Sequence, residues 1–162
     1  MLPSREQMLD AGNRPITQGL FLEIGYNTDM AVYSLKDNDF TYNGKEYPSL
    51  KRLYMETNDP TEYEFAVKYL LSWKHWLRMC ENKQLRGHIN EWRDELEMKL
   101  RSQATKEMMK RSEKGNASAS KWLADKGWAQ RGAGRPSKAE IEREKKIQST
   151  IANEYSDDVV RL

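Results

Sequence analysis

The strongest constraint on the fold comes from residues 61–112, where apolar side chains recur at helical spacing. Up to about residue 80 the apolar side chains form a stripe around the helix that is wider than a helix with one solvent-exposed face requires. After a break at residues 81–83, the second part carries a single apolar seam. That seam consists of Leu85, Ile89, Trp92, Leu96 and Leu100. Two long helices joined by a short turn predict an antiparallel helical hairpin.

This hairpin has more apolar surface than one neighbouring helix covers. An uncovered apolar helix face favours helix-to-helix assembly, so we expect residues 61–112 to form a helical hairpin oligomerisation core. The alternative is that residues 16–57 cover the face within one subunit. The expected oligomer interface or core contacts are Trp73, Trp76, Leu77, Leu85, Ile89, Trp92 and Leu96.

Residues 1–60 indicate a smaller N-terminal region. Residues 16–26 have the pattern of a short apolar helix that ends at Gly25. Aromatic residues then alternate toward Asn43-Gly44, the strongest short-range signal for a β-hairpin. The region therefore predicts a small helical segment with a β-hairpin.

Residues 48–70 raise the possibility of a helix-turn-helix. Ser49 is placed to cap one short helix, residues 58–60 interrupt it, and Thr61 with Glu64 has the spacing of a capping box for the next. A DNA-reading second helix would point its first residues into the major groove. Glu62 and Glu64 would repel phosphates there, so a packing motif is favoured over DNA reading.

Residues 113–162 predict a basic helix, a Gly/Arg/Pro loop, a C-terminal helix and an acidic tail. Asn116 is placed to cap the first helix, and Ser137 with Glu140 has capping-box spacing for the last. The fold class we expect is mainly α: a central antiparallel helical hairpin for oligomerisation, a small N-terminal helical and β-hairpin region, and basic C-terminal helices.

Charge is distributed unevenly along the chain, although the formal net charge is only +2. Residues 99–138 hold 11 Lys and Arg against 3 Asp and Glu, a local net charge of +8. Such a density is typical of a surface that binds a polyanion. The alternative is a solvated helix face whose charge is balanced by acidic neighbours in the fold or in a partner subunit.

The loop before the last predicted helix adds a second nucleic-acid signal. Gly134-Arg135-Pro136 is the core tripeptide of an AT-hook-like segment, in which an extended backbone lets arginine enter an A·T-rich minor groove. Arg131 and Lys138 flank it and would contact phosphates. The same tripeptide also occurs in ordinary polar linkers, so both interpretations stay open.

Catalytic and metal-binding motifs are not apparent, and we expect neither an enzyme nor a bound cofactor or metal. The sequence lacks the Gly-x-x-x-x-Gly-Lys-Ser/Thr pattern of a P-loop. His75 and His88 lack the spacing of a metal site, and the single cysteine, Cys80, falls on an apolar helix without an evident base. That single cysteine also fits a reducing compartment, and no apolar run is long enough for a membrane span. We therefore expect a soluble, cytoplasmic protein.

Residues 40–145 resemble the small terminase subunits of tailed bacteriophages. The resemblance lies in the order of "DPTEYEFA", "WRDELEMKLRSQATKEMM", "KWLADKGW" and "GRPSKAEI" along the chain. It implies a viral DNA-packaging factor that forms a ring, binds double-stranded viral DNA at the packaging site, and recruits and regulates the large terminase, an ATPase and nuclease. It also implies a location in the cytoplasm of the infected bacterial host.

The resemblance departs from the family at the N-terminus. Many small terminases bind DNA through an N-terminal helix-turn-helix, whereas the N-terminal half of this chain is acidic. We therefore expect DNA contact from the basic C-terminal half and docking of the large terminase by the acidic tail, residues 154–162. The expected DNA-binding residues are Lys106, Lys110, Arg111, Lys114, Lys121, Arg131, Arg135 and Lys138.

Two other classes of function share these features. An oligomeric transcriptional regulator or nucleoid-type protein would bind operator or A·T-rich DNA without acting on a packaging ATPase. A purely structural assembly protein would pair its basic residues with acids across subunits and would show no salt-dependent affinity for DNA.

Overall fold

The computed structural model describes residues 2–129 and is mainly helical, as predicted. The chain divides into two compact units, Met1–Glu107 and Met108–Leu162. Three short 3-10 turns, η1 (Glu6–Met8), η2 (Gln18–Leu20) and η3 (Thr28–Met30), precede a two-stranded antiparallel hairpin of β1 (Phe40–Tyr42) and β2 (Lys45–Tyr47). Five helices follow in the described part of the chain: α1 (Leu50–Thr57), α2 (Tyr63–Tyr69), α3 (Trp73–Glu81), α4 (Arg86–Glu113) and α5 (Ala117–Ala124).

The β-hairpin forms where the Asn43-Gly44 signal predicted it. Phe40 pairs with Tyr47 and Tyr42 with Lys45, which leaves Asn43 and Gly44 as the two-residue turn. Their φ angles of 48° and 76° are the positive values that a type I′ turn requires. The turn chemistry therefore agrees with the register of this hairpin.

The predicted helix over residues 16–26 is wrong. Only the 3-10 turn η2 forms there, and Leu20 and Phe21 are fully buried. The Leu20 carbonyl oxygen accepts the backbone N–H groups of Val32 and Tyr33. Because the Leu20 carbonyl oxygen bonds to a distant segment, it is not available for a continuous helix.

The single long helix predicted from residue 61 to residue 80 is also wrong, because it is divided into α2 and α3. Leu70 takes an extended conformation, and the Ser72 side chain caps α3 by accepting the backbone N–H of His75. Tyr33 donates its hydroxyl to the carbonyl oxygen of Tyr69 at 2.5 Å. This hydrogen bond takes the place of the backbone N–H that would bond to the Tyr69 carbonyl oxygen in a continuous helix. It thereby stabilises the break between α2 and α3.

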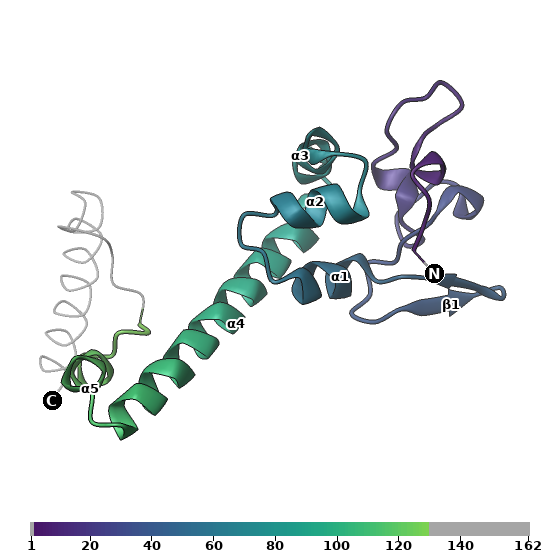
Figure 1. The fold of residues 1–162 in the computed structure, drawn as a ribbon. Helices are drawn as coiled ribbons and strands as arrows, with labels where there is room; N and C mark the ends of the chain where they lie inside the picture. Colours follow the sequence, from purple (N-terminus) through teal and green to yellow (C-terminus); the bar gives the residue numbers. More distant parts are fainter. Residues whose placement is uncertain (1, 130–162) are drawn as a thin grey trace, which may run out of the picture. The chain divides into compact units, whose positions relative to one another are not determined.

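The hydrophobic core lies where α1, α2 and α3 meet the first half of α4, as Figure 1 shows. Tyr54 of α1 is at its centre, with its ring centroid 5.1 Å from Phe65, 6.1 Å from Trp76 and 6.0 Å from Trp92. Residues from the N-terminal region join the same core, among them Leu20, Phe21, Tyr33 and Leu50. The apolar face of the predicted hairpin is thus covered within one subunit by residues of the N-terminal region.

Of the described helices, none has the length and apolar character needed to cross a lipid bilayer.

Candidate functional site

A buried carboxylate, that of Glu62, forms a densely bonded polar centre of the first unit. Its two oxygens accept hydrogen bonds from the Tyr54 hydroxyl at 3.0 Å and from Trp76 Nε1 at 2.9 Å. Arg93 adds two more from Nε and Nη2, at 2.6 and 2.7 Å. Glu62 is 7% exposed. One anion therefore joins side chains of α1, α3 and α4 to the start of α2.

The backbone of Glu62 is as unusual as its side chain. Glu62 has φ 63° and ψ −2°, the left-handed region that favours glycine, directly before α2. Such a conformation costs a non-glycine residue on the order of 1 kcal/mol. The four side-chain hydrogen bonds offset this cost and fix where α2 begins.

The pKa of Glu62 reflects two opposing effects. Burial alone raises the pKa, while hydrogen bonds from Arg93 and Trp76 lower it and prevail, so the pKa lies below its ordinary value. The nearby thiol of Cys80 accepts a contact from Arg93 Nη2 at 3.4 Å, and burial raises the pKa of that thiol to about 11. Cys80 is therefore protonated near neutral pH and is not an activated nucleophile.

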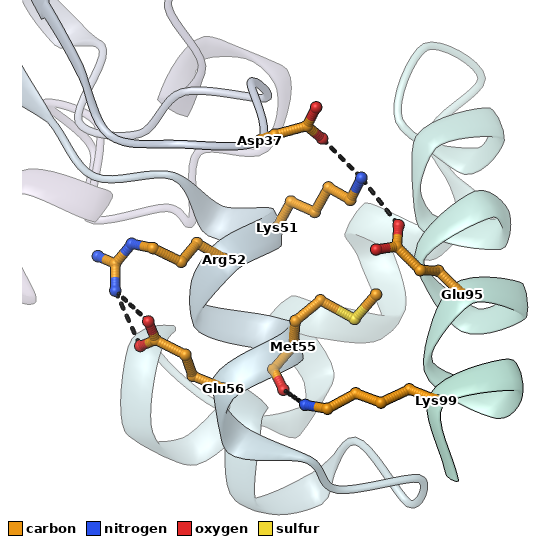
Figure 2. A pocket seen from close by; sticks show the side chains of 7 residues that line it. All are labelled: Asp37, Lys51, Arg52, Met55, Glu56, Glu95 and Lys99. Carbon is orange, nitrogen blue, oxygen red and sulfur yellow. Dashed lines mark hydrogen bonds and ion pairs between the residues drawn. The ribbon is translucent and has the colours of Figure 1, made fainter. Parts of the chain in front are cut away.

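A pocket of about 350 Å³ lies between α1 and α4. Figure 2 shows that Lys51 reaches between Asp37 and Glu95, with Nζ to oxygen distances of 2.6 and 2.9 Å. Lys99 donates to the carbonyl oxygen of Met55 at 2.7 Å. The residues that line the pocket are Asp37, Lys51, Arg52, Met55, Glu56, Glu95 and Lys99.

The charges in this pocket balance each other. Three of its lining side chains are basic and three are acidic. Arg52 is itself held by Asp39 at 2.9 Å and by Glu56 at 2.8 Å. These ion pairs hold α1 against α4 and against the loop that contains Asp37 and Asp39. Because the charges cancel, the pocket has no excess positive charge with which to bind a polyanion.

His75 connects the N-terminal segment to α3. Its Nε2 lies 2.5 Å from the carbonyl oxygen of Ile16, and its Nδ1 accepts the backbone N–H of Leu71 at 3.4 Å. A carbonyl oxygen only accepts, so Nε2 carries the hydrogen and the imidazole is neutral in this arrangement. Burial lowers the pKa of His75 and Arg78 lowers it further, against the opposing effect of the Ile16 hydrogen bond.

The seven predicted interface residues separate into two groups. Trp76, Leu85, Ile89, Trp92 and Leu96 are buried within the subunit, with at most 2% of each exposed. As core residues they present no surface to a second copy, because the N-terminal region already covers them. Trp73 is half-buried and Leu77 is exposed, so only these two of the seven reach the surface.

The predicted DNA-binding residues that the structure describes are all at the surface. Lys106 lies on α4 in the first unit; Lys110, Arg111, Lys114 and Lys121 lie in the second unit. Arg131, Arg135 and Lys138, with the Gly/Arg/Pro loop, the last predicted helix and the acidic tail, lie outside the described residues. Lys126, which follows α5, is exposed and extends the basic set.

The described part of the second unit has a defined local structure. Gly115 takes φ 84° between α4 and α5, and the Asn116 side chain caps α5 by accepting the backbone N–H of Ala119 at 2.9 Å. The hydroxyls of Ser112 and Ser120 are 2.7 Å apart and bond one helix to the other. The basic side chains of this segment are thus carried by the end of α4, by α5 and by the residues that directly follow each helix.

Sequence reasoning missed the Glu62 centre. The sequence pattern indicates an exposed acid at Glu62, at the start of a helix, and a wetter helix face at Arg93. The two are 31 residues apart, and neither has a local signal that predicts the other. The only available hint was that Arg93 follows the buried Trp92 on a helix whose apolar seam is narrow.

Residues 2–129 contain no cluster of three His, Cys, Asp or Glu side chains arranged to hold a metal ion. Comparison with protein-family models, with curated proteins and with solved structures found no match for the chain.

Proposed function

We propose that this protein is an oligomeric DNA-binding factor of viral genome packaging, of the small-terminase type. The observation that carries the proposal is the exposed basic surface of residues 108–129. This segment holds 5 Lys and Arg against 2 Asp and Glu, and the basic ones are all exposed. Lys and Arg at such a density neutralise phosphates and release condensed counterions.

The described residues of the first unit support a scaffolding role. The pocket beside Lys51, and another lined by Tyr54 and Glu62 against α4, hold paired charges and packing side chains, and the Cys80 thiol is protonated. On the proposal, the first unit holds the assembly together and the second presents cations to the duplex. Repetition of a weak site around a ring multiplies its effect through effective concentration. Recruitment of a large terminase follows from the resemblance and is part of the same proposal.

The proposal is tested by measuring mass and DNA affinity on one sample. Light scattering of the full chain should give a multimer that persists in high salt. Fluorescence anisotropy with a duplex of about 30 base pairs should give a logarithmic salt slope of about −0.9 for each phosphate neutralised. A large terminase should hydrolyse ATP at a different rate when this protein and DNA are both present than when it is alone.

Other outcomes would redirect the proposal. A multimer that binds DNA with no effect on a packaging ATPase would favour the transcriptional or nucleoid-type function. A multimer with no salt-dependent affinity for DNA would favour the purely structural function and would contradict the DNA-binding part.

A further inference from the structure

An exposed aromatic side chain, that of Trp128, follows α5 in the second unit. Trp128 is 43% exposed. Its ring meets that of Trp122, which belongs to α5, at a steep angle: the ring centroids are 6.2 Å apart and the planes are inclined by 65°. Trp122 is itself half-buried. It therefore supports Trp128 from one side, while a large part of the Trp128 side chain stays open to solvent.

A turn after α5 holds Trp128 in this position. The backbone N–H of Gly127 donates to the Trp122 carbonyl oxygen at 2.8 Å, and that of Ala129 donates to the Lys126 carbonyl oxygen at 2.9 Å. A Cβ on Gly127 would lie 2.1 Å from Trp122 Cε2, so the backbone can pass this close to the indole ring only at a glycine. The turn thus fixes the ring of Trp128 next to Trp122 without covering it.

The segment that carries Trp128 has an excess of positive charge. Residues 114–129 contain three lysines, Lys114, Lys121 and Lys126, against one acid, Asp125, for a net charge of +2. All three lysines are exposed. An exposed aromatic ring among cations is the combination with which proteins bind single-stranded nucleic acid, because the ring stacks on a base while the cations neutralise phosphates.

The exposed ring favours an unpaired base over an intact duplex as its partner. Each base inside a duplex is stacked on both faces, so an inserted side chain must first unstack a base step, which costs free energy. An unpaired base has a free face, and stacking on it tolerates any sequence because every base has such a face. Contact with duplex phosphates alone would use the lysines and leave the Trp128 ring without a partner.

We propose that Trp128 stacks on an unpaired base, so that the second unit gains an affinity for single-stranded or locally opened DNA that intact duplex does not obtain. The inference rests on the DNA-binding part of the proposed function and names the form of DNA that the second unit recognises. The lysines set the salt dependence of binding, whereas stacking releases no counterions. Trp128 therefore raises the affinity equally at all salt concentrations.

The test is the affinity of the full chain for a labelled oligothymidylate of about 15 nucleotides, measured by fluorescence anisotropy over a range of salt concentrations, beside a duplex of the same length. Trp128→Ala should weaken binding of the single strand by about tenfold and leave the salt slope unchanged. The affinity for the duplex should stay at the wild-type value. Trp128→Phe keeps an aromatic face and should retain most of the single-strand affinity, whereas Trp128→Leu keeps only apolar bulk and should lose it.

The tryptophan fluorescence of the protein gives a second readout of stacking. Saturating oligothymidylate should quench the emission of the wild-type chain, because an indole ring that stacks on a base loses fluorescence. Trp128→Phe should still bind the oligothymidylate but show little of this quenching. A role of Trp128 in the structure of the turn alone would not produce this difference.

The control is Tyr26→Ala, which removes a 93% exposed aromatic ring from the first unit and should change neither affinity. Trp128→Ala and Trp128→Leu variants that bind the single strand like wild type would overturn the stacking and leave DNA binding by the lysines intact. Equal losses for single strand and duplex would also overturn it, since Trp128 would then support the fold of the second unit. A wild-type chain without salt-dependent affinity for either DNA would overturn it together with the DNA-binding part of the proposed function.

Discussion

Arg93 on α4 donates two hydrogen bonds, of 2.6 and 2.7 Å, to the carboxylate of Glu62, which lies 31 residues earlier at the start of α2. The same carboxylate also accepts from Tyr54 and Trp76. A charge removed from water is tolerated only when its hydrogen bonds are satisfied, and here four hydrogen bonds satisfy it. This pair therefore sets how α4 packs against α1, α2 and α3.

Replacement of Arg93 by methionine should destabilise the first unit by about 2 kcal/mol. The change keeps the aliphatic volume but leaves Glu62 buried with half of its hydrogen bonds. The expected loss is below that for a fully buried pair because 40% of the Arg93 side chain is exposed. Urea unfolding followed by tryptophan fluorescence measures the loss.

The matched control for that change is Arg101→Met on the same helix. Arg101 pairs with Glu97 at the surface, where such pairs contribute about 0.5 kcal/mol or less. Equal losses for the two variants would show that the Glu62 centre has no special weight.

Acidification should weaken the fold in two separate ranges of pH. The pKa of His75 is lower in the folded state than in the unfolded state, where it is about 6.5. The neutral imidazole therefore contributes fully to the free energy of unfolding above about pH 6.5, and this contribution is lost as pH falls through the folded-state pKa. The pKa of Glu62 is also lowered, and its contribution is lost only below its ordinary value of about 4.5. Unfolding free energies measured from about pH 7.5 down to about pH 2.5 follow both ranges.

The variant His75→Gln separates the two ranges. It should remove most of the slope between about pH 6.5 and about pH 5 and leave the loss at lower pH. His88→Gln changes the other histidine and should keep the upper slope. If His75→Gln retains the wild-type slope, the neutral imidazole between Ile16 and Leu71 is not its source.

Two glycines should respond to alanine in opposite directions. Gly87 lies in α4, and a Cβ there meets nothing within 4 Å, so Gly87→Ala should stabilise the first unit by about 0.5–1 kcal/mol. Gly115 also has open space, but its φ of 84° strains any side chain. Gly115→Ala should therefore cost about 1 kcal/mol. Thermal unfolding measures the first, and hydrogen exchange over residues 108–124 measures the second.

How far the sequence predicted this fold depends on the range of the interactions. The β1–β2 hairpin and the Ser49 and Asn116 caps were predicted because each depends on residues within a few positions. The break between α2 and α3 was missed because a distant residue, Tyr33, bonds the Tyr69 carbonyl oxygen. The predicted capping by Thr61 is also wrong, since Asp59 accepts the backbone N–H groups of Thr61 and Glu64.

The candidate site shows the same limit. Helical periodicity identified Trp76, Trp92 and Leu96 as apolar positions, but it could not say which surface would cover them. In the folded chain α1 and the N-terminal segment do so, which leaves only Trp73 and Leu77 of the seven predicted interface residues at the surface.

The central claim, DNA binding by the basic second unit, is tested most directly by the salt dependence of duplex affinity. The measurement compares the wild-type full chain with a second-unit variant, Arg111→Ala, Lys114→Ala, Lys121→Ala. The control removes three exposed cations of the first unit: Lys68→Ala, Lys83→Ala, Arg86→Ala. The account predicts weaker binding and a logarithmic salt slope flatter by about 0.9 for each phosphate that the second-unit variant no longer neutralises, while the control keeps the wild-type slope. A wild-type slope in the second-unit variant would contradict the account.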